Sequence, residues 1–463
     1  MHCRPQLQGP AVGRADETTT SAAPALANWW EGLGDPTLNA LVQDALAHNP
    51  DVDIAQARIR AATAQVEQHR AEQLPSASAN ATYLHARLPG VSLGGSSSDS
   101  GAGSDGSSGG SGSSISSLNF YNLGGNASWE VDLFGGTRRA LEQSRATVDA
   151  RFADLADAQV SLSAQVAQAY VNLRDTQERV RLNARSIELQ KQALGLTQQR
   201  FNAGTASSLD IERLQSQLDT TEAQDLPLHA DIAAYLNQLA ILIGKEPGAL
   251  DGQLAAPAAI PLPPASVPVG DPAGLIAHRP DIRAAERTLA ANTAGVGVSE
   301  AKRFPRLSFM GLLGLGGTNI GDVVDPNMFT ALIAPSLSWS FLDFGRTAAT
   351  VHQSEAQRDE ADARYRKAVL AALQDAETSL ARFGNARKQL VTLSRAEASA
   401  ERSATLNGQR VKAGTSSTID QIAIERQRLS AATSVSQGKA ALTNSYIAVQ
   451  KSLGLGWTEP TKP

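Results

Sequence analysis

Few residues in this sequence of 463 amino acids have types and spacing suited to chemistry. The segment Gly106–Gly110 fits the Gly-x-Ser-x-Gly pattern of a nucleophilic serine, but it lies in a Gly/Ser-rich tract without the strand-to-helix setting that such a nucleophile needs. The seven histidines are scattered without paired ligand spacing. Neither a Gly-x-x-x-x-Gly-Lys nor a His-Glu-x-x-His motif occurs. We therefore predict no catalytic residue, no metal site and no cofactor.

Cys3 is the only cysteine, so the chain can form neither an internal disulfide nor a thiolate cluster for a metal. A lone cysteine near an N-terminus is the residue that bacterial lipoproteins acylate, but the apolar stretch that should precede it is absent. Lipidation of Cys3 and an inert thiol therefore both stay open, and the start is expected to be mature, truncated or mis-assigned. Residues 1–28 are predicted to form an extended segment.

Composition narrows the class of protein. The formal charge is −5, which argues against nucleic acid as a partner. Aromatic residues make up only 5%, as in long, thin helices rather than a thick globular core. No apolar run reaches the roughly 18 residues that a spanning helix needs, so any membrane crossing would use strands.

The sequence contains one motif twice. The segment Arg200–Asp210 is echoed by Arg410–Asp420, and Trp129 by Trp339, without an insertion between them. Upstream, His48-Asn49-Pro50-Asp51 matches His278-Arg279-Pro280-Asp281. The copies differ in length only in the first copy's Gly/Ser tract. The predicted segments are an N-terminal segment 1–28, repeat 1 at 29–250, a Pro-rich linker at 251–271, repeat 2 at 272–457 and a tail at 458–463.

Each copy is predicted to contain helices around one β-hairpin. Alternation of apolar with small or polar residues indicates strands, and Pro-free stretches indicate long helices. The expected hairpins are 76–131, with 92–114 as its loop, and 307–341. The expected helices are 38–48, 51–73, 272–278, 281–303 and a long one over 137–200, each copy ending in a helical hairpin that turns at Gly204 or Gly414.

The long helix over 137–200 carries two apolar seams with a period of seven residues. One contains Val166, Leu173 and four later residues (Val180, Ile187, Leu194, Phe201), and the other contains Leu182, Leu189 and Leu196. Two seams on opposite faces predict two neighbouring helices, as in a wall of helices, although an ordinary bundle stays open. The fold class is therefore mainly α with a small β part.

Four strands in one chain cannot close a membrane sheet, so closure would require further copies of the chain. The residues alone do not decide between two and three copies. Aromatic residues in the strands are candidates for an interfacial girdle, with ordinary core residues as the alternative. They are Tyr83, Trp129, Phe329 and Trp339.

At the level of motifs, the sequence resembles the TolC-like outer-membrane efflux factors, in particular the NodT-type lipoproteins. The resemblance rests on Trp29-Trp30-Glu31, Gly34–Leu38, Arg279–Glu286 and Leu453–Trp457, in that order along the chain. It implies a homotrimer with a twelve-stranded outer-membrane β-barrel and a periplasmic α-helical barrel. It also implies a periplasmic adaptor and an inner-membrane RND-type pump as partners, outer-membrane lipid around the strands, and passive efflux of small molecules.

The resemblance assigns roles to the two turns. Arg200, Gly204, Arg410 and Gly414 would form the tip that docks the adaptor. Asp210, Asp420 and Glu425 are the gate candidates, although Ala423 stands where the family commonly has an aspartate. The hairpin around Gly414 is expected to move most on opening. The alternatives are the outer-membrane duct of a type I protein secretion system and, in another class, a soluble coiled-coil scaffold.

Overall fold

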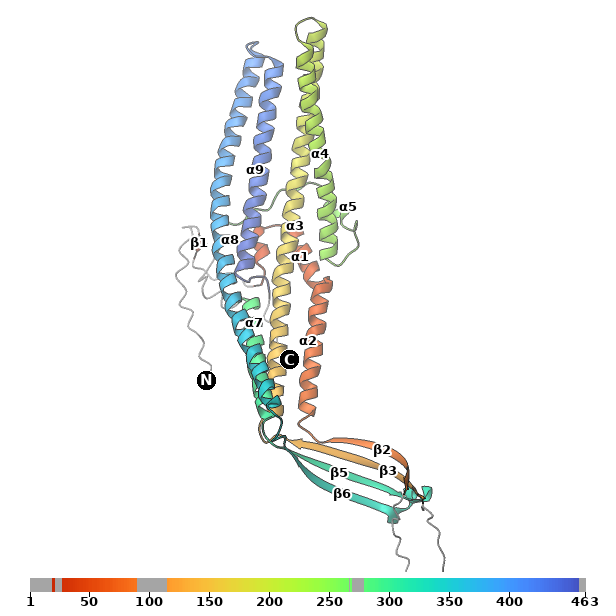
Figure 1. The fold of residues 1–463 in the computed structure, drawn as a ribbon. Helices are drawn as coiled ribbons and strands as arrows, with labels where there is room; N and C mark the ends of the chain where they lie inside the picture. The colour runs from red at the N-terminus through yellow and green to blue at the C-terminus, as the bar shows by residue number, and fades with distance from the viewer. Residues whose placement is uncertain (1–18, 21–26, 90–114, 266, 269–278, 458–463) are drawn as a thin grey trace, which may run out of the picture. The chain divides into compact units, whose positions relative to one another are not determined.

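The computed structural model describes residues 19–20, 27–89, 115–265, 267–268 and 279–457 (Figure 1). Helices dominate, as predicted. The α-helices are α1 (Pro36–His48), α2 (Pro50–Ala71), α3 (Gly136–Asn202), α4 (Ser208–Leu242), α5 (Asp251–Leu254), α7 (Pro280–Ala301), α8 (Arg346–Lys412) and α9 (Thr418–Ser452). The strands are β1 (Thr19–Thr20), β2 (Ser76–Pro89), β3 (Ile115–Val131), β4 (Val267–Pro268), β5 (Arg306–Gly317) and β6 (Phe329–Ser338). Short 3-10 turns are η1 (Trp29–Leu33), η2 (Ile320–Val324) and η3 (Pro326–Met328).

Two compact units divide the chain, and each contains parts of both copies. The helical unit comprises residues 1–62, 147–289 and 360–463, and the sheet unit comprises 63–146 and 290–359. The helices α2, α3, α7 and α8 each run from one unit into the other. With 67 residues each, α3 and α8 are about 100 Å long at 1.5 Å per residue.

Both predicted β-hairpins are present in one four-stranded antiparallel sheet, in the order β2-β3-β5-β6 (Figure 1). The hairpin of copy 1 joins that of copy 2 through β3 and β5, where Trp129 pairs with Phe309 and Ala127 with Gly311. Strand β6 ends at Ser338, so Trp339 lies just beyond the strand. The strands β2 and β6 are the two edges of the sheet.

A duplicated hydrogen bond explains the His-x-Pro-Asp motifs. The amide of Asn49 donates to the carbonyl of Leu242 at 2.8 Å, and the guanidinium of Arg279 donates to the carbonyl of the equivalent Ser452 at 2.7 Å. Both donors are buried. The residue between His and Pro therefore ties the start of one helix to the end of another in each copy.

Glycine is required after these helix ends because other atoms of the protein lie too close to leave room for a Cβ. Gly244 has φ of +72°, and a Cβ there would lie 2.3 Å from the carbonyl oxygen of His48. Gly454, its equivalent, has φ of +72°, and a Cβ would lie 2.9 Å from Cγ of Arg279. Only glycine satisfies both the left-handed backbone and the contact.

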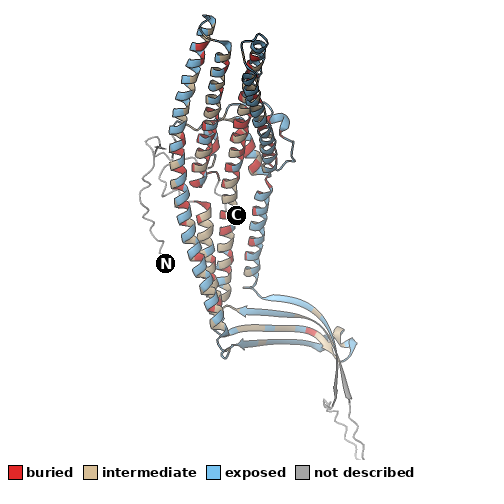
Figure 2. Ribbon diagram, turned by 45° about the horizontal axis from the view of Figure 1, so that its top comes forward, coloured by how far each residue is buried: buried red, intermediate tan, exposed pale blue. Residues whose placement is uncertain are grey.

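The main core belongs to the helical unit, and buried residues lie along the inner faces of its helices (Figure 2). It joins η1 and α1, from the start of the chain, to α3, the end of α4 and the end of α9. The ring of Trp29 meets that of Tyr446 edge to face, with centroids 6.1 Å apart. Tyr170 donates to Asp35, the residue that caps α1, at 2.7 Å.

The inter-repeat linker is held by donors from the helices. Its prolines cannot donate, but its carbonyls accept hydrogen bonds. Arg174 donates to the carbonyl of Ala256 at 2.8 Å, and Thr443 donates to that of Pro261 at 2.7 Å. The predicted helix 272–278 lies outside the described residues, as do the loop 92–114 and the tail 458–463.

The two predicted seams of α3 behave differently. Leu182 and Leu189 are buried against Ile422 and Leu429 of α9, so the second seam has the predicted neighbour. In the first seam, burial is complete at Val166 and Leu173 only, and the later members are half-buried or exposed.

Polar residues join α3 to α4, and periodicity of apolar residues does not detect such a contact. Asn183 of α3 donates to Asp225 of α4 at 2.9 Å, and Gln190 of α3 donates to Thr221 of α4 at 2.9 Å. Helix α4 also continues through Pro227 to Leu242, beyond the Pro-free stretch that predicted it.

Candidate functional site: the two helical turns

Each helical hairpin reverses direction at a turn closed by the same two contacts. In the first turn, the hydroxyl of Thr205 donates to the carbonyl of Arg200 at 3.0 Å, and the guanidinium of Arg200 donates to the carbonyl of Thr205 at 3.4 Å. Thr415 and Arg410 repeat these contacts in the second turn at 3.1 and 3.3 Å. Both arginines are exposed. Each guanidinium thus closes its own turn and still faces solvent.

The two turn glycines are required by backbone conformation alone. Gly204 and Gly414 have φ of +74° and +73°, and a Cβ at either position would meet nothing within 4 Å. The space around both turns is therefore open, in contrast to Gly244.

The carboxylates after the turns act as helix caps. Ser207 and Asp210 form a capping box, in which the backbone amide of Asp210 donates to the Ser207 hydroxyl at 3.2 Å and the Ser207 amide donates to the Asp210 carboxylate at 3.1 Å. The hydrogen bonds from Ser207 hold the pKa of Asp210 below its usual range. Asp420 accepts from the hydroxyl of Ser417 at 2.7 Å. Both predicted gate aspartates therefore have a local structural partner.

A polar network distinguishes the second hairpin from the first. Ser416 donates to Asn407 at 2.9 Å, Asn407 donates to Gln421 at 2.8 Å, and Gln421 donates to the carbonyl of Ala404 at 3.1 Å. The equivalent residues in the first hairpin are Ala206, Thr197 and Ile211, which cannot form this network. The second turn is therefore cross-linked to both of its helices.

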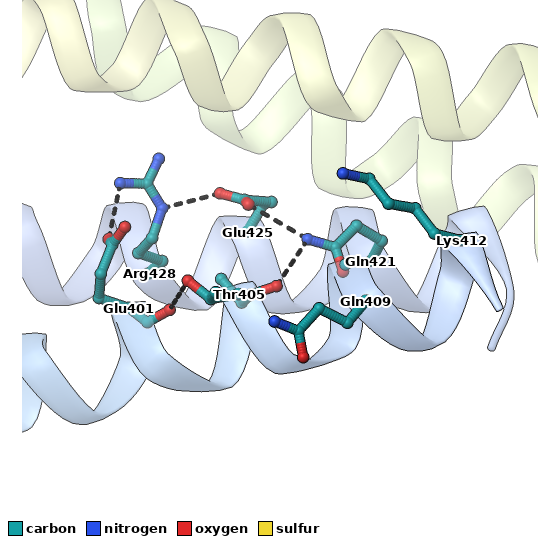
Figure 3. Close-up of a pocket in the computed structure, with 9 residues that line it drawn as sticks. Glu401, Thr405, Gln409, Lys412, Gln421, Glu425 and Arg428 are labelled. Atoms are coloured by element: carbon teal, nitrogen blue, oxygen red, sulfur yellow. Dashed lines mark hydrogen bonds and ion pairs between the residues drawn. The ribbon is translucent and has the colours of Figure 1, made fainter. Parts of the chain in front are cut away.

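Glu425, the third gate candidate, lies in a hollow of about 440 Å³ between α8 and α9 (Figure 3). Its carboxylate accepts from Arg428 at 2.7 Å and from Gln421 at 3.2 Å. Arg428 also donates to Glu401 of α8 at 3.1 Å. Lys412 extends toward the hollow from the end of α8 (Figure 3). Glu425 is therefore engaged by its own hairpin.

The apolar residues of the two turns also differ in exposure. Phe201 and Leu209 of the first turn are 40% and 72% exposed. Their equivalents in the second turn, Val411 and Ile419, are half-buried. The first turn thus presents an apolar surface and the second a polar one.

The girdle candidates fall into two groups on the sheet. Trp129 and Trp339 lie at the end next to the helices, where their indoles donate to the equivalent carbonyls of Gln73 and Arg303 at 3.1 and 3.0 Å. At the level where β5 ends, Tyr83 stacks on its cross-strand partner Tyr121 with ring centroids 4.9 Å apart.

Phe329, at the start of β6, belongs to this second group. It pairs with Leu315 of β5, and Leu315 pairs with Leu123 of β3, two residues from Tyr121 along the strand. The aromatic candidates thus lie at two levels of the sheet rather than one.

Other candidates are absent or not described. Within the described residues, no group of three or more His, Cys, Asp or Glu side chains could hold a metal ion. No helix in the described ranges is long and apolar enough to cross a membrane. Cys3 lies outside the described residues.

Comparison with known proteins decides the family. Residues 41–245 and 273–455 match the family described as "Outer membrane efflux protein". The chain belongs to the outer membrane efflux protein family. The two matched segments of this efflux protein fall within the two predicted repeats.

Relatives and solved structures agree with this assignment. The efflux protein is 30% identical over 451 residues to the pyoverdine export outer membrane protein OpmQ of Pseudomonas aeruginosa, covering 96% of this chain and 90% of the relative. It is similar to the outer-membrane channel OprN, with 33% identity, a TM-score of 0.84, and 96% and 95% of the two chains covered. The CmeC channel of Campylobacter jejuni, at 22% identity and a TM-score of 0.85 over 97% and 92% of the two chains, shares the fold.

The efflux protein therefore acts in efflux at the outer membrane, which confirms the predicted family, function and location. Its relatives are outer-membrane components of export and efflux pumps. Sequence reasoning located both turns but missed the roles of Asn407, Gln421 and Arg428. Comparing the two copies position by position would have pointed to Gln421 and Arg428, because the equivalent residues in the first hairpin, Ile211 and Leu218, are apolar.

Proposed function

We propose that this chain is one protomer of a homotrimeric exit duct, with a twelve-stranded β-barrel in the outer membrane and an α-helical barrel in the periplasm. A periplasmic adaptor and an inner-membrane RND-type pump supply the directionality, and the duct itself catalyses no reaction. The proposal rests on the antiparallel pairing of β3 with β5, through which the hairpin of one repeat pairs with the hairpin of the other.

The two edge strands of the sheet are equivalent to the two strands that pair at its centre. Strand β6 is the copy-2 equivalent of β3, and β2 is the copy-1 equivalent of β5. Unpaired backbone groups at such edges are costly in lipid, so a membrane sheet must close. Pairing of β6 with β2 of a neighbouring chain closes it, and three chains give twelve strands.

Aromatic stacking beside the pairing of β3 with β5 supports the same arrangement. Phe134, which follows β3, stacks on Phe304 beyond the end of α7, with centroids 4.6 Å apart. The equivalent of Phe134 is Phe344, which is 93% exposed, and the equivalent of Phe304 is Leu74, also exposed. Within one chain, Phe344 therefore lacks the stacking partner that Phe134 has. In the proposed trimer, Leu74 of a neighbouring chain packs against Phe344.

The pairing of β3 with β5 also predicts the register of closure. Ala127 pairs with Gly311 and Ser128 with Met310. The equivalent pairs between chains are Leu337 with Ala81 and Ser338 with Asn80.

Cysteine cross-linking in a Cys3→Ser background tests this register. We expect at least one of two double variants, Leu337→Cys/Ala81→Cys or Ser338→Cys/Asn80→Cys, to form chain-to-chain disulfides in outer-membrane fractions, because directly paired strand residues come within disulfide range. Leu337→Cys/His85→Cys is the matched control, about 13 Å out of register at 3.3 Å per residue. Absence of cross-links in both pairs, or equal cross-linking in the control, would refute the arrangement.

The aromatic groups fit the proposed membrane position. Along β3, Trp129 and Tyr121 are eight residues apart, or roughly 26 Å at 3.3 Å per residue. That spacing is close to the apolar band of about 25 Å in outer-membrane barrels. The two groups would then lie at the two lipid interfaces.

The helical turns are the proposed docking site for the adaptor. Both arginines and both open glycines are accessible there, and the first turn adds the exposed Phe201 and Leu209. We expect Phe201→Ser/Leu209→Ser to reduce adaptor capture on affinity resin while the heat-resistant trimer persists. Adaptor capture equal to wild type would count against docking at this turn.

The cargo is proposed to be small organic molecules, since the relatives' names include pyoverdine and toluene. Loss of the chain's gene should then sensitise cells to such compounds, without loss of secreted protein. Cys3 is the proposed site of acylation, a supplementary anchor to the membrane. Failure of Cys3 to incorporate labelled palmitate in cells would exclude it.

A further inference from the structure

The two helical hairpins differ at one pair of equivalent positions in the returning helix. In the first hairpin, Leu218 of α4 is buried, only 5% exposed, and Gln215 precedes it by one turn. In the second, Arg428 and Glu425 occupy these positions. An apolar contact in one copy is thus replaced by an ion pair in the other.

Arg428 bridges the two helices of the second hairpin (Figure 3). Its Nε donates to Glu425 on the same helix at 2.7 Å, and its Nη1 donates to Glu401 on α8 at 3.1 Å. The donation from Gln421 holds the other oxygen of Glu425. The guanidinium therefore uses its fork to connect α9 to α8, a geometry that lysine cannot reproduce.

Packing around Arg428 is loose on two sides. It borders the hollow of about 440 Å³ toward α8 and a second hollow of about 470 Å³ toward α3, which Leu182 and Leu429 also border. Each hollow has room for on the order of ten water molecules. At this level the contact between α8 and α9 includes the charges of Arg428, Glu425 and Glu401.

We infer that Arg428 is an ionic latch, a positioning residue that sets how tightly α8 is held to α9 beside the second turn. At the equivalent level the first hairpin buries Leu218 instead, and its helices share one exposed ion pair, in which Lys191 of α3 lies 2.8 Å from Glu222 of α4. The second hairpin is therefore the one whose contact at this level weakens more when charge is screened or removed. The effect of the latch on opening rests on the proposed duct, whereas its effect on the hairpin does not.

Three variants isolate the latch. Arg428→Gln removes the fork, and Arg428→Lys keeps the charge without the fork. Glu425→Gln/Arg428→Leu gives the second hairpin the residues of the first. Arg395→Gln is the matched control, since Arg395 is an exposed arginine of the same hairpin and forms no ion pair with any described residue.

Amide hydrogen exchange of the detergent-purified full chain measures directly how often the helices of the second hairpin open. Exposed ion pairs are worth little, so we expect Arg428→Gln to speed exchange around residues 401–428 by about two- to fivefold. Raising salt from about 0.1 M to about 1 M should speed exchange similarly in the wild type, because screening shortens the Debye length from about 10 Å to about 3 Å. The Gln/Leu double variant should be insensitive to salt, and Arg428→Lys should fall between wild type and Arg428→Gln.

Two exchange results would overturn the latch. One is exchange in Arg428→Gln that equals wild type or the Arg395→Gln control. The other is a salt response of the same size in wild type and Arg428→Gln.

Single-channel recording in planar bilayers then tests the effect on opening. We expect Arg428→Gln to raise the open fraction and the Gln/Leu double variant to lower it. Faster exchange with unchanged conductance would refute the role in opening. A wild-type protein that forms no pore would refute the proposed duct, and exchange would still decide the latch.

Discussion

Replacing Gly244 by alanine is expected to destabilise the helical unit strongly. Gly244 follows α4 in a left-handed conformation, with φ of +72°. An added Cβ would lie 2.3 Å from the carbonyl oxygen of His48, a backbone atom that cannot move alone. Relief of the clash would displace the neighbouring Asn49, whose side chain donates to the carbonyl of Leu242 at 2.8 Å.

The expected magnitude has two parts. The left-handed conformation costs a non-glycine residue about 1–2 kcal/mol. Forcing an extra methyl against a packed backbone adds about 1–3 kcal/mol. Gly244→Ala should therefore lower the free energy of unfolding by about 2–5 kcal/mol.

Gly204→Ala is the matched control. Gly204 has nearly the same φ, +74°, but no atom lies within 4 Å of an added Cβ, so only the conformational cost of about 1–2 kcal/mol applies. Urea unfolding of both variants, followed by circular dichroism at 222 nm, compares them. If Gly244→Ala were no more destabilising than Gly204→Ala, the contact with His48 would not constrain this junction.

Three further predictions concern other buried or duplicated contacts. Burial raises the pKa of Asp175, although Ser436 donates to it. Its contribution to stability is complete below the ordinary pKa of 3.8 and is lost as the pH rises through the raised pKa, so Asp175→Asn should flatten the decline of the urea midpoint as the pH rises above 3.8. Trp129→Phe and Trp339→Phe each remove one indole hydrogen bond and should cost about 1 kcal/mol by the same unfolding assay, whereas a much larger loss in one would show that the copies are not equivalent there. Arg174→Met removes a buried donor from the linker carbonyls, and it should speed thermolysin cleavage in residues 255–265, with a destabilisation of about 3 kcal/mol; an unchanged cleavage rate would mean that other contacts hold the linker.

The sequence was sufficient for the element order because its local signals agree. Helices begin at Pro50 and Pro280, one residue before the predicted starts, and the glycines at 204 and 414 follow the ends of the long ones. Strand bounds came within a few residues, since alternation and turn residues mark both ends. The repeat supplied a second, independent view of each element.

Polar contacts between distant segments could not be predicted in the same way. The bond from Asn49 to Leu242 joins residues far apart in sequence, and neither residue type has a periodicity that indicates the partner. Glu425 was a gate candidate because of its charge and position, but its environment depends on Arg428 and Gln421, which meet it only in the folded hairpin. Charge in a sequence identifies ionisable groups but not their partners.

The shared core of the two chain ends also sets an order of events during synthesis. Trp29 is among the first described residues, yet its ring packs against Tyr446 in the last helix. A chain that emerges N-terminus first lacks this contact until the final helix arrives. The fluorescence of Trp29 should therefore change in the last phase of folding.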